Sequence, residues 1–123
     1  MIDHLAIQCG DMAASTAFYD AVLAPVGGRR ILDVGEAIGY GVDFPSFWLG
    51  PARTDGPARE SHIAFAAASR AAVVAFHEAA LAIGAESLHA PREWPEYHAS
   101  YFGAFVRDPD GNNVEAVCHL PAA

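Results

Sequence analysis

Hydrophobic and polar positions follow the same pattern twice along the chain. A short apolar run, "HLAIQC" from His4, precedes an amphipathic segment that begins after Asp11, and "HIAFAA" from His62 precedes another that begins after Ser69. Short apolar-rich runs are typical of strands, and apolar residues recurring every three to four positions are typical of helices. Asp11 and Ser69 both favour a helix N-cap, because a side-chain oxygen can accept hydrogen bonds from the free amides of the first turn. Each half is therefore predicted to begin with a strand and a helix.

The two predicted helices each have one apolar face. Its members are Ala14, Phe18, Ala21 and Val22 in the first helix, and Val73, Phe76, Ala80 and Leu81 in the second. A shift of 58 positions superposes His4 on His62 and Phe18 on Phe76. Two unrelated amphipathic segments need not agree in this way, so the sequence indicates an internal duplication.

Shorter strand-like pieces follow each helix. They are "RRILDV", "AIGYGVDF" and "SFWLG" in the first half, and "ESLHA", "YFGAFVRD" and "NVEAVCH" in the second. "DPDGN", at 108–112, favours a tight turn between the last two strands. We predict a first module over about 1–50, an exposed linker over about 51–59 and a second module over about 60–123, together in one domain. A chain of 123 residues is too short for two independent cores, so the halves must share one.

Composition limits the classes of partner. The chain is 53% hydrophobic and 18% charged, which is typical of a soluble globular protein, and no apolar run has the length of about 20 residues that spans a bilayer. A net charge of -8 without any lysine argues against a nucleic-acid partner. No basic segment followed by an apolar run marks a secretory signal, so a cytoplasmic location is expected. Cys9 and Cys118 are expected to be buried free thiols.

The first strand of each half is predicted to carry a histidine among small neighbours. In an alternating strand, Leu5, Ile7 and Cys9 point to one face, where they are expected to pack under the helices. His4, Ala6 and Gln8 then lie on the opposite face, as do His62, Ala64 and Ala66 in the second half.

Glu115 lies in the middle of a strand that otherwise consists of core residues. A carboxylate there would pay a large desolvation cost unless it were paired or bound to a metal. Arg107 and His119 are the candidate partners if Glu115 has only a structural role. Its position thus indicates either a buried pair or a metal ligand.

The chain resembles the vicinal oxygen chelate superfamily, which includes glyoxalase I, extradiol dioxygenases, and fosfomycin and bleomycin resistance proteins. The resemblance covers nearly the whole chain and rests on the paired modules, "DMAASTAFYDAVL" and above all "DPDGNNVEAV". It implies an α+β fold in which two βαβββ modules form a cup-shaped mixed sheet around a divalent metal, and it implies a homodimer. It also implies that His4, His62 and Glu115 are the metal ligands. Two imidazoles and a carboxylate suit Fe, Mn, Zn, Ni or Co, with positions open to water and a small-molecule substrate.

One departure from the family pattern concerns a fourth ligand. Glyoxalase I has a second carboxylate on the last strand of its first module, where this chain has "FPSFWLG". Lactoylglutathione lyase activity is therefore not expected. Trp48 is instead predicted to form a wall of the substrate pocket.

The segment "HAPREWPEYHASYFG", from His89 to Gly103, is predicted to cover the mouth of the cup. Within it, His98 and Tyr101 are candidate catalytic groups, as an acid, a base or a hydrogen-bond donor to an oxyanion. Tyr101 and Arg92 are candidate substrate-binding residues, with Arg92 suited to an anion. The alternatives are an ordered loop that packs its aromatic side chains and, for Arg92, an ordinary surface charge.

Two functions of different classes remain open. The first is a metal-dependent lyase, isomerase or dioxygenase that chelates a small oxygenated substrate. The second is a metal-free binding protein that sequesters a ligand, as bleomycin resistance proteins do.

Overall fold

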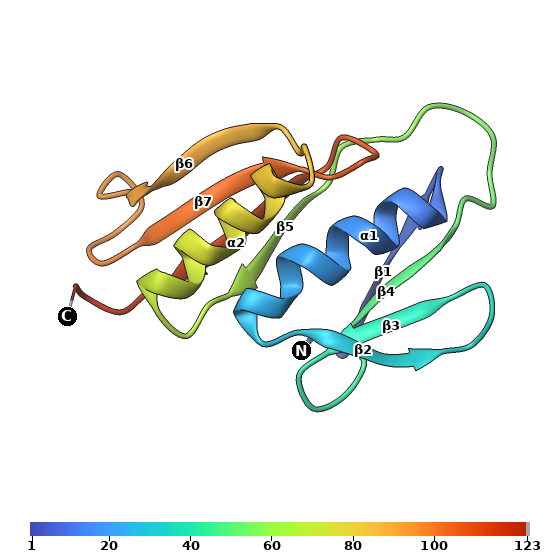
Figure 1. Cartoon of the computed structure of the whole chain (residues 1–123), viewed down its shortest axis with the longest axis horizontal. Coiled ribbons are helices and arrows are strands. Elements are labelled where there is room, and N and C mark those ends of the chain that lie inside the picture. Colours follow the sequence, from blue (N-terminus) through green and yellow to red (C-terminus); the bar gives the residue numbers. More distant parts are fainter. Residues whose placement is uncertain (123) are drawn as a thin grey trace.

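The fold is that of a computed structural model, which describes residues 1–122 (Figure 1). Its elements, in chain order, are β1 (Leu5–Cys9), α1 (Met12–Leu23), the 3-10 turn η1 (Ala24–Val26), β2 (Arg29–Asp33), β3 (Ile38–Gly41), β4 (Phe47–Pro51), β5 (His62–Ala66), α2 (Arg70–Ala82), β6 (Ser87–Glu93), β7 (Phe102–Arg107) and β8 (Asn113–Cys118). The predicted duplication is confirmed, since each half contains a strand, a helix and three further strands. Both predicted N-caps are also present: Asp11 accepts from the amide of Ala14 at 3.0 Å, and Ser69 from that of Ala72 at 3.1 Å.

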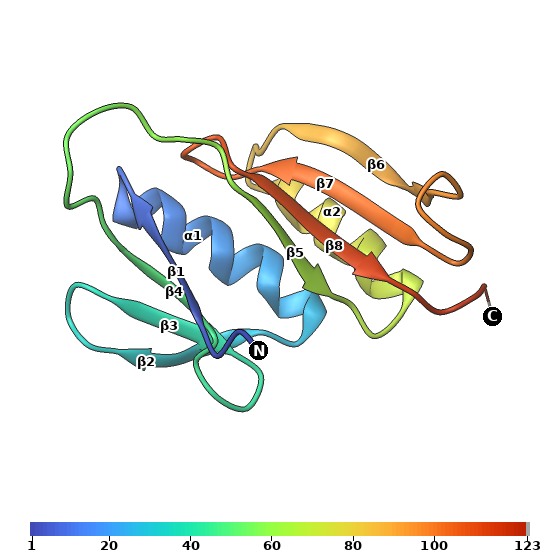
Figure 2. The same ribbon diagram turned by 180° about the vertical axis from the view of Figure 1, so that it is seen from behind.

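Each module forms a mixed four-stranded sheet. The strand orders are β1-β4-β3-β2 and β5-β8-β7-β6, with the pairs β1/β4 and β5/β8 parallel and the other neighbours antiparallel. Both helices lie on the same side of the molecule in Figure 1, and the strands lie in front of them when it is seen from behind (Figure 2). The predicted α+β class with two βαβββ modules is confirmed.

The two modules share one hydrophobic core. It contains Phe18 and Val22 of α1 together with Val73 and Phe76 of α2, and all four side chains are buried. Polar contacts reinforce this junction, because the buried hydroxyl of Tyr19 on α1 donates to Asp108 at 2.6 Å, in the turn before β8. A chain of this length stabilises two modules by burying the inner faces of both helices together.

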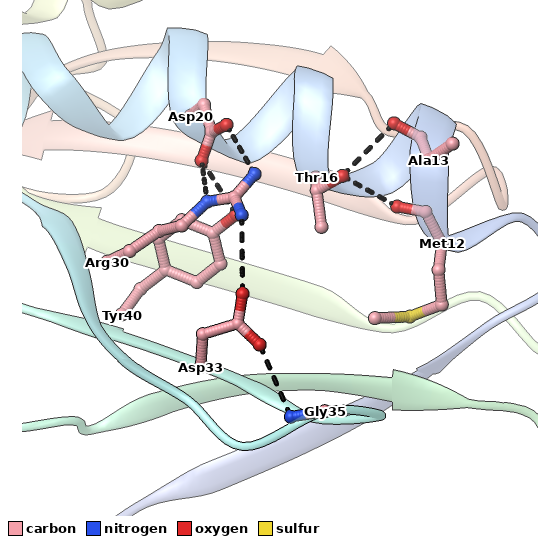
Figure 3. Close-up of polar contacts among 8 residues, drawn as sticks. All are labelled: Met12, Ala13, Thr16, Asp20, Arg30, Asp33, Gly35 and Tyr40. Carbon is pink, nitrogen blue, oxygen red and sulfur yellow. Dashed lines mark hydrogen bonds and ion pairs between the residues drawn. The ribbon is translucent and has the colours of Figure 1, made fainter.

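A polar cluster fastens α1 to its own sheet (Figure 3). Asp20 on α1 accepts two hydrogen bonds from the guanidinium of Arg30 on β2, at 2.8 and 2.7 Å, and one from the hydroxyl of Tyr40 on β3, at 2.9 Å. The hydrogen bonds from Arg30 hold the pKa of the Asp20 carboxyl below its usual range. Asp20 also gives the hydroxyl of the buried Tyr40 the hydrogen-bond partner that a buried polar group requires.

Two local expectations are wrong. Leu5 was expected in the core, but it is 42% exposed, because it starts an edge strand and lines a cavity of about 770 Å³ between β1 and β5. The strand predicted from "ESLHA" was expected to end near Ala90, but in the structure this strand, β6, continues to Glu93. Pro91 does not stop it, since β6 is an edge strand on which a missing amide hydrogen is tolerated. The loop that follows is therefore shorter than expected, spanning 94–101.

Two further expectations are confirmed in the described part of the chain. Cys9 and Cys118 are buried and free. The DPDGN segment forms a turn in which the amide of Gly111 donates to the carbonyl of Asp108 at 3.0 Å, with Gly111 at a φ of 86°. Within residues 1–122, neither helix has the length and apolar character needed to cross a bilayer.

Candidate metal centre

His62 and Glu115 meet on the sheet of the second module. They lie on the parallel neighbours β5 and β8, where His62 is opposite Asn113 and Ala64 is opposite Glu115. The Nε2 atom of His62 is 2.8 Å from Oε1 of Glu115. The carboxylate is almost fully buried, with 1% of its side chain exposed, whereas the imidazole is 54% exposed. The pair therefore offers one buried oxygen donor and one accessible nitrogen donor.

Tyr101 occupies the second oxygen of the Glu115 carboxylate. Its hydroxyl donates to Oε2. Burial, followed by this hydrogen bond and the negative charge of Glu115, raises the pKa of the Tyr101 hydroxyl. Tyr101 therefore keeps its proton at neutral pH and acts as a donor.

Gly103 makes room for this arrangement. A Cβ atom at this position would lie 3.2 Å from Oε2 of Glu115 and 3.3 Å from Cε1 of Tyr101. Such contacts are tighter than most side-chain contacts, so any larger residue would push the carboxylate or the ring aside. The space beside the carboxylate thus depends on a missing side chain.

The two structural partners expected for Glu115 bind elsewhere. Arg107 donates to Glu60 and to the carbonyl of Gly111, and the ring of His119 is hydrogen-bonded to His98. The buried carboxylate instead has His62 and Tyr101 as its partners.

His4 lies apart from this pair within one chain. It directly precedes β1, whereas His62 opens β5, and these two strands run in opposite directions (Figure 2). His4 is exposed, and its Nδ1 is 2.6 Å from a carboxylate oxygen of Asp3. Among residues 1–122, no three His, Cys, Asp or Glu side chains come together as a metal-binding group. The chain by itself thus brings together two of the three predicted ligands.

Trp48 lies on the same sheet as His4. It is opposite Ala6 across the β1/β4 pair, and its indole donates to the carbonyl of Pro45 at 3.0 Å. Trp48 and His4 both line a shallow pocket of about 330 Å³ on the first module. The predicted pocket wall is therefore next to the predicted ligand of its own module.

The 94–101 loop and the end of β6 carry an aromatic stack. The guanidinium of Arg92 lies 3.4 Å from the centroid of the Trp94 ring, and Trp94 stacks on Tyr97 at 5.5 Å. Arg92 also forms an ion pair with Glu96 at 3.2 Å. Arg92 is thus held by neighbours in its own segment, and Tyr97 is the member of the stack with the most exposed surface, at 56%.

His98 and His119 form a second pair beside Tyr101. His98 Nε2 is 3.1 Å from His119 Nδ1, and the centroids of both rings lie 5.2 Å from that of Tyr101. His119 was expected only as a candidate structural partner of Glu115, without a functional role. The alternation of the last strand places His119 on the same face as Glu115, and this was the signal that could have identified it.

The donors at the His62–Glu115 pair fit a first-row divalent ion. An imidazole nitrogen and a carboxylate oxygen are ligands that Fe, Mn, Zn, Ni and Co accept, and a third ligand would be needed to fix the ion. The room left by Gly103 lies beside Oε2, the carboxylate oxygen that Tyr101 engages, and lets the carboxylate turn Oε1 toward His62. In a single chain, the His4 imidazole is not close enough to the His62–Glu115 pair to be this third ligand.

Comparison with known families gives one match over most of the chain. A sequence model described as the Glyoxalase/Bleomycin resistance protein/Dioxygenase superfamily matches residues 1–116. A comparison with curated proteins gave no match.

Several solved structures have the same fold. A glyoxalase/bleomycin resistance protein from Albidiferax ferrireducens T118 is 28% identical, with 94% of this chain and 96% of that chain covered and a TM-score of 0.77. A glyoxalase/bleomycin resistance protein/dioxygenase family enzyme from Burkholderia phytofirmans PsJN is 22% identical, with 97% and 98% covered and a TM-score of 0.72. A lactoylglutathione lyase from Agrobacterium tumefaciens is 24% identical, with 96% and 92% covered and a TM-score of 0.70. At these identities, the similarity to the last two proteins shows a shared fold only.

Proposed function

The chain belongs to the glyoxalase/bleomycin resistance protein/dioxygenase superfamily, and from this premise we propose that it is a metal-dependent enzyme acting on a small oxygenated substrate. The reaction class is that of a lyase, an isomerase or an extradiol-type dioxygenase. The observation that carries the proposal is the buried Glu115 carboxylate in contact with the accessible His62 imidazole. A strand interior tolerates such a carboxylate when it is paired, and a ligand role explains why one partner faces solvent.

His4, His62 and Glu115 would hold the ion. The ion would supply Lewis-acid stabilisation of a substrate oxyanion and a bidentate anchor for two neighbouring substrate oxygens. Because the Tyr101 hydroxyl keeps its proton, it is a hydrogen-bond donor rather than a base, and it would donate to a substrate oxygen by turning away from Oε2 of Glu115. His98 is a candidate proton carrier in the same loop. Trp48 and Arg92 are candidate contacts for a flat or anionic substrate.

A homodimer would complete the site. In one chain, the sheet faces away from the helices are uncovered (Figure 2), and within residues 1–122 His4 does not come together with His62 and Glu115. In a twofold dimer each interface residue occurs twice, so a second copy could bring its own first module against the second module of this chain. We propose that the partner copy supplies the His4 imidazole, and with it the Trp48 pocket wall, to the His62–Glu115 pair.

Lactoylglutathione lyase activity does not belong to this proposal. That reaction needs a base on the first module, and β4 consists of Phe47, Trp48, Leu49, Gly50 and Pro51, with no carboxylate. The likeness to the Agrobacterium enzyme lies below the identity at which an activity could be transferred.

The second candidate function is a metal-free protein that binds and sequesters a ligand. The aromatic stack of Trp94 and Tyr97 favours it, because the exposed Tyr97 ring offers a surface for a planar compound without any metal. This function requires no convergence of imidazoles on Glu115.

Metal analysis by mass spectrometry separates the two candidates. The protein is purified without an affinity tag or chelator, as wild type and as Glu115→Ala. The enzyme proposal expects about one metal ion more per chain in the wild type than in the variant. Wild-type protein that holds no more metal than the variant after incubation with Fe, Mn, Zn, Ni and Co in turn would overturn it in favour of the binding protein.

A further inference from the structure

We propose that His98 and His119 form a second transition-metal site, at which an ion such as Zn²⁺, Ni²⁺ or Cu²⁺ fastens the 94–101 loop to the end of β8. His98 belongs to this loop, and His119 directly follows β8. Their facing nitrogens, Nε2 of His98 and Nδ1 of His119, are 3.1 Å apart, and the ring planes are inclined by only 22°. The inference uses neither His62 nor Glu115, and with the ion bound His98 would serve as a ligand rather than as a proton carrier.

The separation of the two nitrogens matches that of two ligands on one ion. Imidazole nitrogens bind Zn²⁺ at about 2.0–2.1 Å. Two such nitrogens in neighbouring positions of a tetrahedral or octahedral site lie about 2.9–3.4 Å apart. The observed 3.1 Å falls within this interval. Both side chains are exposed, so the small rotations that aim them at an ion meet little resistance.

The tautomer of His98 is fixed in the form that a metal requires. Its Nδ1 is 2.6 Å from the carbonyl oxygen of Ala99, and a carbonyl can only accept. The proton of neutral His98 therefore sits on Nδ1, and Nε2 presents a lone pair toward His119. Metal-binding histidines commonly have their second nitrogen bonded to a carbonyl in this way, which orients the ring. His119 becomes the second ligand when its proton moves to Nε2.

The surroundings hold the pair in place and leave it open to water. The edge of the Tyr101 ring packs against both imidazoles. Ser100, between His98 and Tyr101, has a φ of 66°, a left-handed conformation that is unfavourable for a non-glycine residue and persists where the surroundings demand it. Water can complete the coordination because both rings are exposed. The net charge of -8 also favours a cation over an anion at this surface.

The site would act on the loop that carries Tyr101. The Tyr101 hydroxyl bonds to Glu115, while its ring packs on His98 and His119. An ion joining the two histidines would link the loop to β8 by two coordinate bonds, in place of one hydrogen bond between exposed rings. We therefore expect the ion to protect residues 94–101 from local opening.

Calorimetric titration with Ni²⁺ of the full-length Glu115→Ala protein tests the proposal, because the His62–Glu115 pair is already broken in this background. One Ni²⁺ per chain is expected. Adding His119→Ala should weaken this binding at least about tenfold, the lower end of what losing a supporting group costs a metal site. Adding His89→Ala instead should leave it unchanged, since His89 is an exposed imidazole of the same sheet that contacts Trp94 and Phe105.

Nuclear magnetic resonance gives a second measurement that keeps both histidines and so does not depend on the folding of a His119 variant. In the Glu115→Ala protein, Zn²⁺ should shift the ring nitrogen signals of His98 and His119 together, and amide exchange across 94–101 should slow. The proposal is overturned if the Glu115→Ala protein binds no Ni²⁺, if His119→Ala leaves its affinity unchanged, or if Zn²⁺ shifts other histidines instead. None of these results would alter the expectation for the His62–Glu115 pair in the wild type.

Discussion

Nε2 of His62 lies 2.8 Å from Oε1 of Glu115, although the two residues are 53 positions apart in the chain. The contact is possible because β5 and β8 are parallel neighbours whose side chains alternate in phase. A buried carboxylate without a partner would be unfavourable. The contact pairs Glu115 with an imidazole that is exposed at the surface of the sheet.

Mixed dimers test whether a partner copy completes the site. A dimer of one His4→Ala chain and one Glu115→Ala chain retains a single intact set of ligands if His4 comes from the partner. Every chain in this experiment and in its control also carries His119→Ala, which removes the proposed His98–His119 site. Isolated through two different tags that are then removed, the mixed dimer should contain about one half of the metal per chain that the His119→Ala protein contains.

The control is a mixed dimer of His62→Ala and Glu115→Ala chains. Both changes lie in the second module, so every site in this dimer lacks a ligand and no metal is expected. Metal in the control, or none in the His4/Glu115 mixture, would contradict a site shared in this way.

Gly103→Ala should disturb the site with little effect elsewhere. The new Cβ would lie 3.2 Å from Oε2 of Glu115 and would displace the carboxylate or Tyr101, so metal affinity should fall by about 10-fold or more. Competition with a chromophoric chelator measures the change. Gly50→Ala is the matched control, because a Cβ there meets no atom within 4 Å. Equal affinities in the two variants would show that the space beside Glu115 is not needed.

Tyr19→Phe should weaken the junction between the modules. The buried hydroxyl donates to the buried Asp108 carboxylate at 2.6 Å, and hydrogen bonds to charged groups contribute about 1.5–3 kcal/mol. The free energy of unfolding in urea should fall by about this amount. Tyr97→Phe removes a hydroxyl from a side chain that is 56% exposed and should change it by less than about 0.5 kcal/mol. A similar small change for Tyr19→Phe would mean that the hydrogen bonds from Asp110 and Asn112 satisfy Asp108 without Tyr19.

His77 should make the fold less stable in mild acid. Burial lowers the pKa of this α2 side chain from its ordinary value of 6.5, so the unfolded chain binds a proton more readily than the folded one. Its contribution is therefore complete above about pH 6.5 and is lost as the pH falls toward the lower folded pKa. Urea unfolding of wild type and His77→Gln at pH 7.5 and pH 5 should show a smaller pH difference in the variant. An unchanged difference would assign the effect to other groups.

The strands, helices and turns were largely predictable because they follow from neighbours in the chain. Asp11 and Ser69 cap helices through contacts three residues away, and Gly111 accepts the left-handed conformation that its turn needs. The exposure of Leu5 and the end of β6 were predicted wrongly, because both depend on which strands lie at the edge of a sheet. Periodicity contains no information about strand order.

The candidate site was predictable only in part. Alternation placed His62 and Glu115 on open faces of their strands, but their contact depends on the register between β5 and β8. The pairing of His98 with His119 joins a loop to the end of a strand, and no spacing rule connects those positions.

The sequence by itself determined a duplicated α+β chain with one shared core, because caps, turns and apolar periodicity depend only on residues that are close together in the sequence. Tertiary structure alone decided that Glu115 binds His62 and Tyr101, and that within residues 1–122 His4 does not join them. These relationships arise from strand order, direction and register, which are fixed by packing the two modules together rather than by any local pattern.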